Sequence, residues 1–329
     1  MAVALDGILN VAKPSGMTSH DVVDYLRRLT GVKKAGHTGT LDPGATGVLP
    51  VCLGKATRII RYLPGDKAYR AEITFGIATN TGDGYGEVIR RGDAADLTRE
   101  KVAAALQHFK GKIEQIPPMT SAVRHQGKRL YELARQGLEV ERKARRVVIY
   151  DLRLVNVSGL GSGTPRAVIE LACSAGTYVR SLCIDLGEKL GCGAHMSALV
   201  RTRAGPFTLE NALPLEEIAA LHRRGGLPGV LVSPAEALAH LPAIQVKPTA
   251  VPAVKSGNQL YLPGVAGYGD EINRLESGQL VRLFAGQDLL AVARKRQDAA
   301  GKPYFQPETV LADPCSDIRH PTSDDRRLI

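Results

Sequence analysis

Apolar side chains along the chain recur at helical and at strand-like spacing in turn. Residues 18–30 predict a helix with one apolar face, capped by Thr18 or Ser19 and ended by Gly31. Residues 98–109 predict a second helix of this kind. Strands are predicted over 69–75, 148–157 and 166–173. The chain is therefore expected to mix helices with strands.

The stretch SAGTYVRSLCIDLG, residues 174–187, turns from the last of these strands into a helix. Its leucines continue every four residues to Leu190, which gives the helix an apolar face. Tyr178 and Arg180 then lie where the strand ends and the helix begins. Rigid neighbours can hold functional side chains at such a junction.

The pattern of apolar, Gly and Pro residues changes in the last third of the chain. Residues 233–236, SPAE, form a capping box with proline at the first helical position, and predict a last helix before Leu241. Beyond about residue 248, short apolar runs alternate with Gly and Pro. We expect a boundary near Gln245 that separates a large domain over 1–244, a small β-rich module over 245–312 and a flexible tail over 313–329.

Charge narrows the choice of partner. The 329 residues carry a formal net charge of +10, with a pI near 9.4. This balance favours a polyanion, although charge alone does not choose between RNA, DNA and an acidic small molecule. The sequence has no apolar run of about 18 residues and no charged segment before a shorter one. We therefore expect no membrane association, no secretion and a cytoplasmic location.

The usual cofactor and metal motifs are missing from the sequence. The five cysteines form no C-x-x-C pair and have no histidine at metal-ligand spacing, so we expect buried free thiols. Lys55 lacks the Ser or Thr that follows the lysine of a phosphate loop, and no complete dinucleotide fingerprint or nucleophile elbow is found. The sequence therefore predicts neither a cofactor nor a metal.

A basic segment follows the proline-marked QIPPMTSA. Residues 121–147 hold eight Lys or Arg and three Glu. A charge run of this kind is commonly a solvated helix face. Here it forms a long excursion between a helix and a strand, and an insert that clamps a phosphate backbone fits equally well. The residues alone leave both interpretations open.

One carboxylate stands in the glycine-rich run GHTGTLDPGATG, residues 36–47. Asp42, Pro43 and Gly44 predict a type II turn, which would by itself explain the pattern. However, proline also restrains the residue before it, so Asp42 has a stiff backbone. The glycines would let a ligand approach the main chain closely. A carboxylate held in this way can act as nucleophile or general base, provided that a cation keeps it ionised.

Six segments carry a resemblance to a known family. In chain order they are LNVAKPSGMTSHDVV, GHTGTLDPGATGVLPVCLGKATR, DKAYRAEITFG, QIPPMTSAVRHQGKRLYELARQGLEV, GTYVRSLCIDLG and ALVRTRAGPF. Together, over residues 7–210, they resemble the TruB family of tRNA pseudouridine synthases. The module after residue 245 is similar to the small PUA-type RNA-binding domain of family members. The resemblance implies an α+β pseudouridine synthase fold, in which helices flank a central mixed, largely antiparallel sheet, with a C-terminal β-rich PUA-like domain.

The resemblance also implies an activity. The uridine at position 55 in the T-arm of tRNA would be isomerised to pseudouridine, without cofactor or metal. The uracil leaves C1′, rotates and rejoins through C5, so the base must first be flipped out. An RNA-clamping insert over about 115–147 would grip the T-arm stem-loop. Guide-RNA-dependent relatives lack this insert, which therefore points to a stand-alone enzyme that needs no guide RNA. We also expect a monomer.

Three residues match the family's reactive positions. Asp42 matches the catalytic aspartate, which either attacks C1′ or starts the formation of a glycal. Arg180 matches the arginine that pairs with this aspartate and keeps it ionised and oriented. Tyr69 matches the tyrosine that stacks on the flipped base and takes part in proton removal.

Other residues match binding positions. His37 matches the histidine that enters the T-loop and fills the space left by the flipped base. Tyr178 and Val200 match residues that line the pocket, with Val200 replacing a leucine. Lys13 matches a residue that supports the active-site loops. Thr120 stands where relatives often have tyrosine, which leaves the role of that position open.

The basic insert contributes Arg129 and Arg142, which are expected to contact tRNA phosphates. Two alternatives stay open: a guide-RNA-dependent pseudouridine synthase, and a protein that binds or folds the tRNA elbow without obligatory turnover. Asp42, Tyr69 and Arg180 together favour an enzyme, because binding alone needs no buried carboxylate near phosphates.

Overall fold

The structure, a computed structural model, describes residues 5–267 and 274–312. Over these residues the chain forms two compact units. The larger unit holds 9–52 and 64–231, and the smaller holds 5–8, 53–63 and the described part of 232–312. The boundary near Gln245 stays a prediction. The predicted tail and Cys315 lie outside the described residues.

A nine-stranded sheet forms the centre of the larger unit. Its main path runs β1-β3-β12-β4-β11-β10-β7, with β2 beside β3 and β13 beside β12. β12 pairs parallel with β3, whereas the ladders from β12 through β4, β11 and β10 to β7 are antiparallel. The predicted mixed, largely antiparallel sheet is confirmed. Its strands are β1 (Gly7–Lys13), β2 (Ala35–His37), β3 (Thr46–Leu53), β4 (Lys67–Phe75), β7 (Gly111–Gln115), β10 (Arg145–Ser158), β11 (Arg166–Cys173), β12 (Ala194–Ala204) and β13 (Phe207–Thr208).

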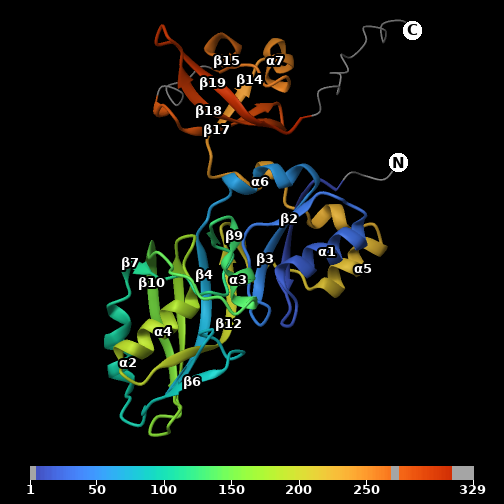
Figure 1. The fold of residues 1–329 in the computed structure, drawn as a ribbon. Helices are drawn as coiled ribbons and strands as arrows, with labels where there is room; N and C mark the ends of the chain where they lie inside the picture. Colours follow the sequence, from blue (N-terminus) through green and yellow to red (C-terminus); the bar gives the residue numbers. More distant parts are fainter. Residues whose placement is uncertain (1–4, 268–273, 313–329) are drawn as a thin grey trace, which may run out of the picture. The chain divides into compact units, whose positions relative to one another are not determined.

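Helices α2 (Arg99–Gln107) and α4 (Val179–Lys189) cover one face of this sheet (Figure 1). Their apolar stripes, which include Val102 and Leu182, meet β4 side chains such as Ile73 in one buried cluster. The cluster has the close packing expected between a sheet and helices with one apolar face. It fixes the start of α4 against the sheet.

Helix α1 (Ser19–Thr30) packs beside β2 and near α5 (Leu215–Arg223), as seen in Figure 1. The Thr18 hydroxyl accepts the Asp21 amide, and Asp21 accepts the Thr18 amide, which completes a capping box. Gly31 ends the helix with a φ of 72°. Both predicted ends of this helix are confirmed.

Two smaller elements project from the sheet. A hairpin of β5 (Ile77–Thr79) and β6 (Val88–Arg91) follows β4. The basic insert leaves β7 and returns as β10, its antiparallel neighbour, and contains β8 (Arg124–His125), β9 (Lys128–Arg129) and α3 (Leu130–Arg135).

The smaller unit contains a six-stranded sheet with the order β15-β19-β18-β17-β14-β16. The predicted β-rich module is therefore confirmed. Its strands are β14 (Ala243–Val246), β15 (Leu260–Tyr261), β16 (Val265–Ala266), β17 (Leu280–Ala285), β18 (Asp288–Gln297) and β19 (Pro303–Val310). The 3-10 helix η1 (Gly54–Tyr62) belongs to the same unit.

One prediction for this unit is wrong. Helix α6 (Pro234–Ala237) has the predicted Ser233 cap, but it is not the last helix, since α7 (Val251–Lys255) follows. Pro252 lies in the first turn of α7, where its missing N–H costs no helical hydrogen bond.

The four described cysteines are free and buried, as predicted: Cys52, Cys173, Cys183 and Cys192. Within 5–267 and 274–312, no helix is long and apolar enough to cross a membrane.

Candidate active site

Asp42 and Arg180 form the central ion pair of the larger unit. Arg180 Nε lies 2.9 Å from Asp42 Oδ2, and Arg180 Nη2 donates to Asp42 Oδ1 over 3.1 Å. This two-bond geometry fixes the carboxylate plane as well as its position. The Arg180 side chain is 5% exposed, whereas Asp42 keeps 34% of its side-chain surface open to solvent. A buried arginine therefore holds the carboxylate, while part of the carboxylate side chain stays accessible to solvent.

Arg180 has further acceptors that fix its own position. Its Nη1 donates to the Thr81 carbonyl over 3.3 Å and to the Thr120 hydroxyl, and lies 3.6 Å from Asp83 Oδ2. Its Nη2 also donates to the Thr120 carbonyl over 3.0 Å. Thr120, the departure from the family pattern, thus contacts the arginine that binds Asp42.

The environment raises the pKa of Asp42 above its ordinary value. Burial is the main cause; Arg180 and Lys13 oppose it, and the Asp83 carboxylate adds to it. The ion pair therefore offsets only part of the effect of burial. A carboxylate in this state has a higher affinity for electrophiles and protons than one in water.

The turn that carries Asp42 differs from its prediction. The Ala45 amide donates to the Asp42 carbonyl over 3.0 Å, so the four-residue turn is present. Gly44, however, does not have the positive φ that a type II turn requires. Glycine is needed there for space, because a Cβ at Gly44 would lie 2.1 Å from Cε2 of Tyr85. The type II assignment is therefore wrong.

The residues on either side of Asp42 are clamped by buried side chains. The Ser19 hydroxyl accepts the Leu41 amide over 2.8 Å and donates to the Leu41 carbonyl over 3.1 Å. Lys13, 1% exposed, donates to the Pro43 carbonyl over 3.1 Å, and to the carbonyls of Pro14 and Met17. Its burial lowers the pKa of Lys13 to about 8. The turn is thus positioned by the first strand and the first helix.

Arg201 holds the wider loop. It is fully buried and donates to the carbonyls of Val48, Gly39 and Thr40 over 2.6, 3.0 and 3.3 Å. Within the described parts of the chain, no carboxylate pairs with it. Gly47, with a φ of 102°, allows this approach, because its Cβ would lie 2.3 Å from the Arg201 carbonyl oxygen. The space that a side chain at position 47 would fill is therefore occupied by the main chain of Arg201, and not by a ligand.

Tyr69 lies in β4, opposite Arg201 in the β12 ladder, and is 7% exposed. Burial raises the pKa of Tyr69 to about 12, while Arg201 acts to lower it and Asp42 to raise it. Tyr69 is thus the ladder partner of the arginine that holds the main chain just before Asp42. At neutral pH its phenol is un-ionised.

His37 ends β2 and is half-buried. Its Nδ1 accepts the Gly39 amide over 3.2 Å. Burial lowers the pKa of His37, and Arg201, His20 and Arg129 lower it further. The ring is therefore a neutral imidazole at the edge of the Asp42 loop.

Tyr178 and Val200 lie directly beside the residues already described. Tyr178 precedes α4 and forms two hydrogen bonds with the buried Gln115 side chain. The Tyr178 amide donates to Gln115 Oε1 over 3.0 Å, and Gln115 Nε2 donates to the Tyr178 carbonyl over 3.2 Å. Val200, half-buried in β12, is opposite Thr46 of β3. The structure thus brings both to the elements that carry Arg180 and Arg201.

The two arginines of the insert have different surroundings. Arg129 is exposed at the end of β9. Arg142 donates to the Pro117 carbonyl over 3.2 Å and lies 3.3 Å from Glu139, with 25% of its side chain exposed. Arg129 is therefore available to an RNA phosphate, whereas Arg142 is tied to the insert itself.

Several side chains of this site were not predicted from the sequence. Ser19 is expected only as a helix cap, and Asp83 stands in the run GDGYG, which lacks the third glycine of a dinucleotide fingerprint. A charged residue in the middle of a buried strand was the one signal for Arg201. No feature of the sequence indicated that Gln115 would support the site.

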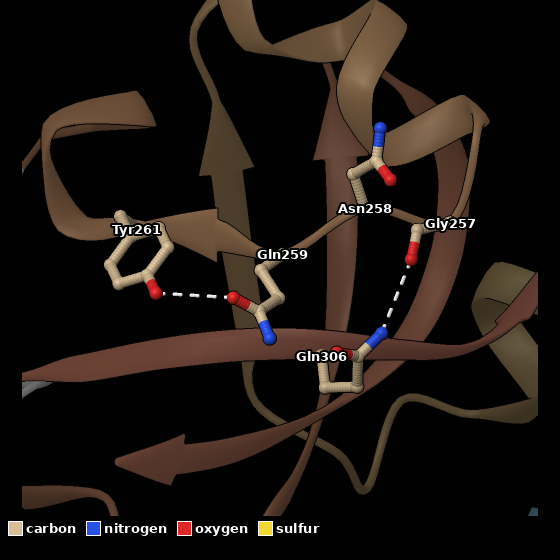
Figure 2. A pocket seen from close by; sticks show the side chains of 5 residues that line it. All are labelled: Gly257, Asn258, Gln259, Tyr261 and Gln306. Carbon is tan, nitrogen blue, oxygen red and sulfur yellow. Dashed lines mark hydrogen bonds between the residues drawn. The ribbon is translucent and has the colours of Figure 1, made fainter. Parts of the chain in front are cut away.

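The smaller unit has a separate pocket of about 440 Å³ at the end of α7. Figure 2 shows the Tyr261 hydroxyl donating to Gln259 and the Gln306 amide donating to the Gly257 carbonyl. Tyr261 is 39% exposed, and its ring centroid lies 5.5 Å from that of Tyr304. The lining of the pocket therefore combines side-chain amide groups with one aromatic ring, that of Tyr261.

Comparisons with known proteins identify the family of this chain. The sequence model described as TruB family pseudouridylate synthase (N terminal domain) matches residues 27–179, and that described as tRNA pseudouridylate synthase B C-terminal domain matches residues 180–238. A Pelotomaculum thermopropionicum protein named tRNA pseudouridine synthase B is 52% identical over 94% of this chain and 98% of its own. A Symbiobacterium thermophilum protein of the same name is 57% identical over 78% of this chain and 83% of its own.

The fold has solved counterparts. A crystal structure of a Cbf5-Nop10-Gar1 complex contains a chain that matches with a TM-score of 0.70 and 29% identity. The match covers 94% of this chain and 85% of that one. The fold expected from the resemblance is confirmed. The sequence models and the relatives agree, and the chain belongs to the TruB family of pseudouridylate synthases.

Proposed function

We propose that this chain converts a uridine of tRNA, at position 55 in the T-arm, to pseudouridine. The observation that carries the proposal is the Asp42–Arg180 pair, with its two contacts of 2.9 and 3.1 Å, in a chain 52% identical to a tRNA pseudouridine synthase B. The position of Tyr69 opposite Arg201, which holds the loop of Asp42, supports the proposal. The relatives' name supplies tRNA as the substrate class.

The chemistry follows from the residues in place. Asp42, reachable from solvent and held by Arg180, either adds to C1′ as the N1–C1′ bond breaks or removes a proton to start a glycal. The freed uracil rotates, and C5 bonds to C1′ as the Asp42–C1′ bond breaks or, in the glycal route, as C2′ regains the proton that Asp42 removed. The C5 proton then leaves while N1 gains one. The reaction is an isomerisation, so no oxidant or co-substrate is consumed. We assign Tyr69 to the face of the flipped base, because an un-ionised buried phenol suits stacking.

Binding is assigned to groups around this centre. The neutral imidazole of His37 suits a group that replaces a base within a stacked loop, since it carries no charge into that space. Tyr178 and Val200 would line the uracil pocket. The exposed Arg129 would contact a phosphate, and the β-rich module would add further RNA contact.

The test is tritium release from tRNA labelled at uracil C5, because that hydrogen is lost when the C5–C1′ bond forms. We expect release by the wild-type chain, none by Asp42→Asn, and tRNA affinities within a few-fold of each other. Substantial turnover by Asp42→Asn would overturn the role of this residue.

A bare T-arm hairpin separates the alternatives. Release from the hairpin without any other RNA excludes dependence on a guide. Binding without release would instead favour a protein that folds the tRNA elbow. We further propose a monomer acting in the cytoplasm, which sedimentation of the protein–hairpin complex and cell fractionation would test.

A further inference from the structure

We propose that Tyr85 is a stacking platform for an unpaired nucleobase that neighbours the flipped uridine. The inference rests on the proposed function and adds a substrate contact to it. Tyr85 lies in the turn between β5 and β6 and is 78% exposed. Nothing in the resemblance assigned a role to it.

The turn that carries Tyr85 is ordered by Asp83. One carboxylate oxygen of Asp83 accepts the Thr81 hydroxyl over 2.7 Å and the Tyr85 amide over 3.1 Å. The Asp83 carbonyl accepts the Thr79 hydroxyl over 2.7 Å. The other carboxylate oxygen lies 3.6 Å from Arg180. The same residue therefore contacts the central arginine and fixes the backbone of Tyr85.

The ring itself lies against the turn that carries Asp42. A Cβ at Gly44 would meet Cε2, Cζ and the hydroxyl of Tyr85 at 2.1, 2.5 and 2.5 Å. These atoms form one edge of the ring, so this edge contacts the Gly44 backbone, two residues after Asp42. Because the residue is 78% exposed, most of the ring surface is left open to solvent.

An exposed ring in this position suits a base better than any other ligand group. In the described part of the chain, the Tyr85 hydroxyl has no hydrogen-bond partner, so no polar contact explains its position. The anchored turn limits the loss of conformational freedom on binding. Base stacking on an aromatic ring is worth about 1–3 kcal/mol and is tolerant of sequence. Flipping one base out of the T-loop leaves its neighbours without a stacking partner.

The chain offers a direct spectroscopic test, since it contains no tryptophan. Tyr85→Trp would introduce a single indole at the rim of the site. We expect its fluorescence to be quenched on titration with a T-arm hairpin, using an Asp42→Asn background to prevent turnover. Tyr150→Trp is the matched control, because Tyr150 is 59% exposed on β10, which β12, β4 and β11 separate from β3, the strand that follows the Asp42 loop.

Kinetics give a second arm. Tyr85→Ala should lower kcat/KM for tRNA by about 5- to 150-fold, the equivalent of one stacked base. Tyr85→Phe should retain nearly all of it, and Tyr150→Ala should have no effect. The salt dependence of binding should be unchanged by Tyr85→Ala, because no charge is removed.

Three results would overturn the proposal: an unquenched indole at position 85 when filter binding shows the hairpin bound, a loss of less than two-fold in Tyr85→Ala, or an equal loss in Tyr85→Phe. The last would assign the effect to the hydroxyl. Tritium release by the wild-type chain tests the proposed function separately. Tritium release by the wild-type chain without fluorescence quenching at position 85 contradicts only the role of Tyr85. Quenching without tritium release contradicts only the proposed reaction.

Discussion

Replacement of Arg201 by methionine tests how the Asp42 loop is held. The guanidinium donates to three main-chain carbonyls over 2.6, 3.0 and 3.3 Å, and the side chain is fully buried. Hydrogen bonds from a charged donor contribute about 1.5–3 kcal/mol each. Methionine also removes a buried charge whose desolvation costs several kcal/mol. We therefore expect the free energy of unfolding to fall by about 2–4 kcal/mol.

Thermal unfolding followed by circular dichroism measures this loss. For a folding unit of about 150–250 residues, such a loss lowers Tm by about 5–15 °C. Tritium release should fall as well, at temperatures where the variant is still folded, because Gly39, Thr40 and Val48 flank Asp42. Arg201→Lys should recover only part of both, since an ammonium group lacks the planar fork that reaches several carbonyls at once.

The matched control is Arg203→Met on the same strand. The Arg203 side chain is 36% exposed, lies 3.7 Å from Asp66 and donates to the Gly205 carbonyl over 3.2 Å. Its loss should cost less than about 1 kcal/mol. If the two variants unfold at the same temperature, the three carbonyl contacts do not hold the loop and the reasoning is refuted.

Other predictions concern charge. Because burial raises the pKa of Asp42, the acid limb of kcat/KM should lie at a pH above the usual aspartate range near 3.9, and Arg180→Lys should move it higher; a limb at the ordinary value contradicts this. Burial lowers the pKa of Lys13 to about 8, whereas the pKa of lysine in an unfolded chain is about 10.4. Between these two pH values the unfolded chain binds more protons than the folded chain. The stability of wild type relative to Lys13→Met should therefore rise across that window in urea unfolding; a flat difference would count against it. Arg129→Ala with Lys143→Ala should reduce the salt slope of tRNA binding by about 1.4–1.8, and an unchanged slope would remove the clamp.

Local patterns predicted the elements of the larger unit well, because each depends on neighbouring residues. The ends of α1 follow from Thr18 and Gly31, whose effects are confined to a single turn. Helix α7 was missed because proline has opposite effects in the first turn and in the interior of a helix, and the sequence around Pro252 does not reveal which applies.

The site was predicted only as far as the resemblance reached. Asp42 and Arg180 are 138 residues apart, and no local pattern predicts that they meet. The residues that hold them have no chemical signature of their own: Ser19 is an ordinary helix residue until Leu41 is placed against it. The reason for glycine at position 44 depends on Tyr85, a contact across the fold that turn rules do not contain.

The base of the insert is joined to the start of α4 by hydrogen bonds at three residues, Tyr178, Arg180 and Ser181. Gln115 bonds to Tyr178, Thr120 to Arg180, and the Ser181 hydroxyl donates to the Ile116 carbonyl over 2.8 Å. Arg180 therefore takes two of its acceptors from the segment that would grip RNA. Any displacement of that segment changes the support of the guanidinium, and through it the orientation of the carboxylate. RNA binding by the insert is thus coupled to the orientation of the Asp42 carboxylate. An RNA too short to contact the insert would therefore react slowly as well as bind weakly.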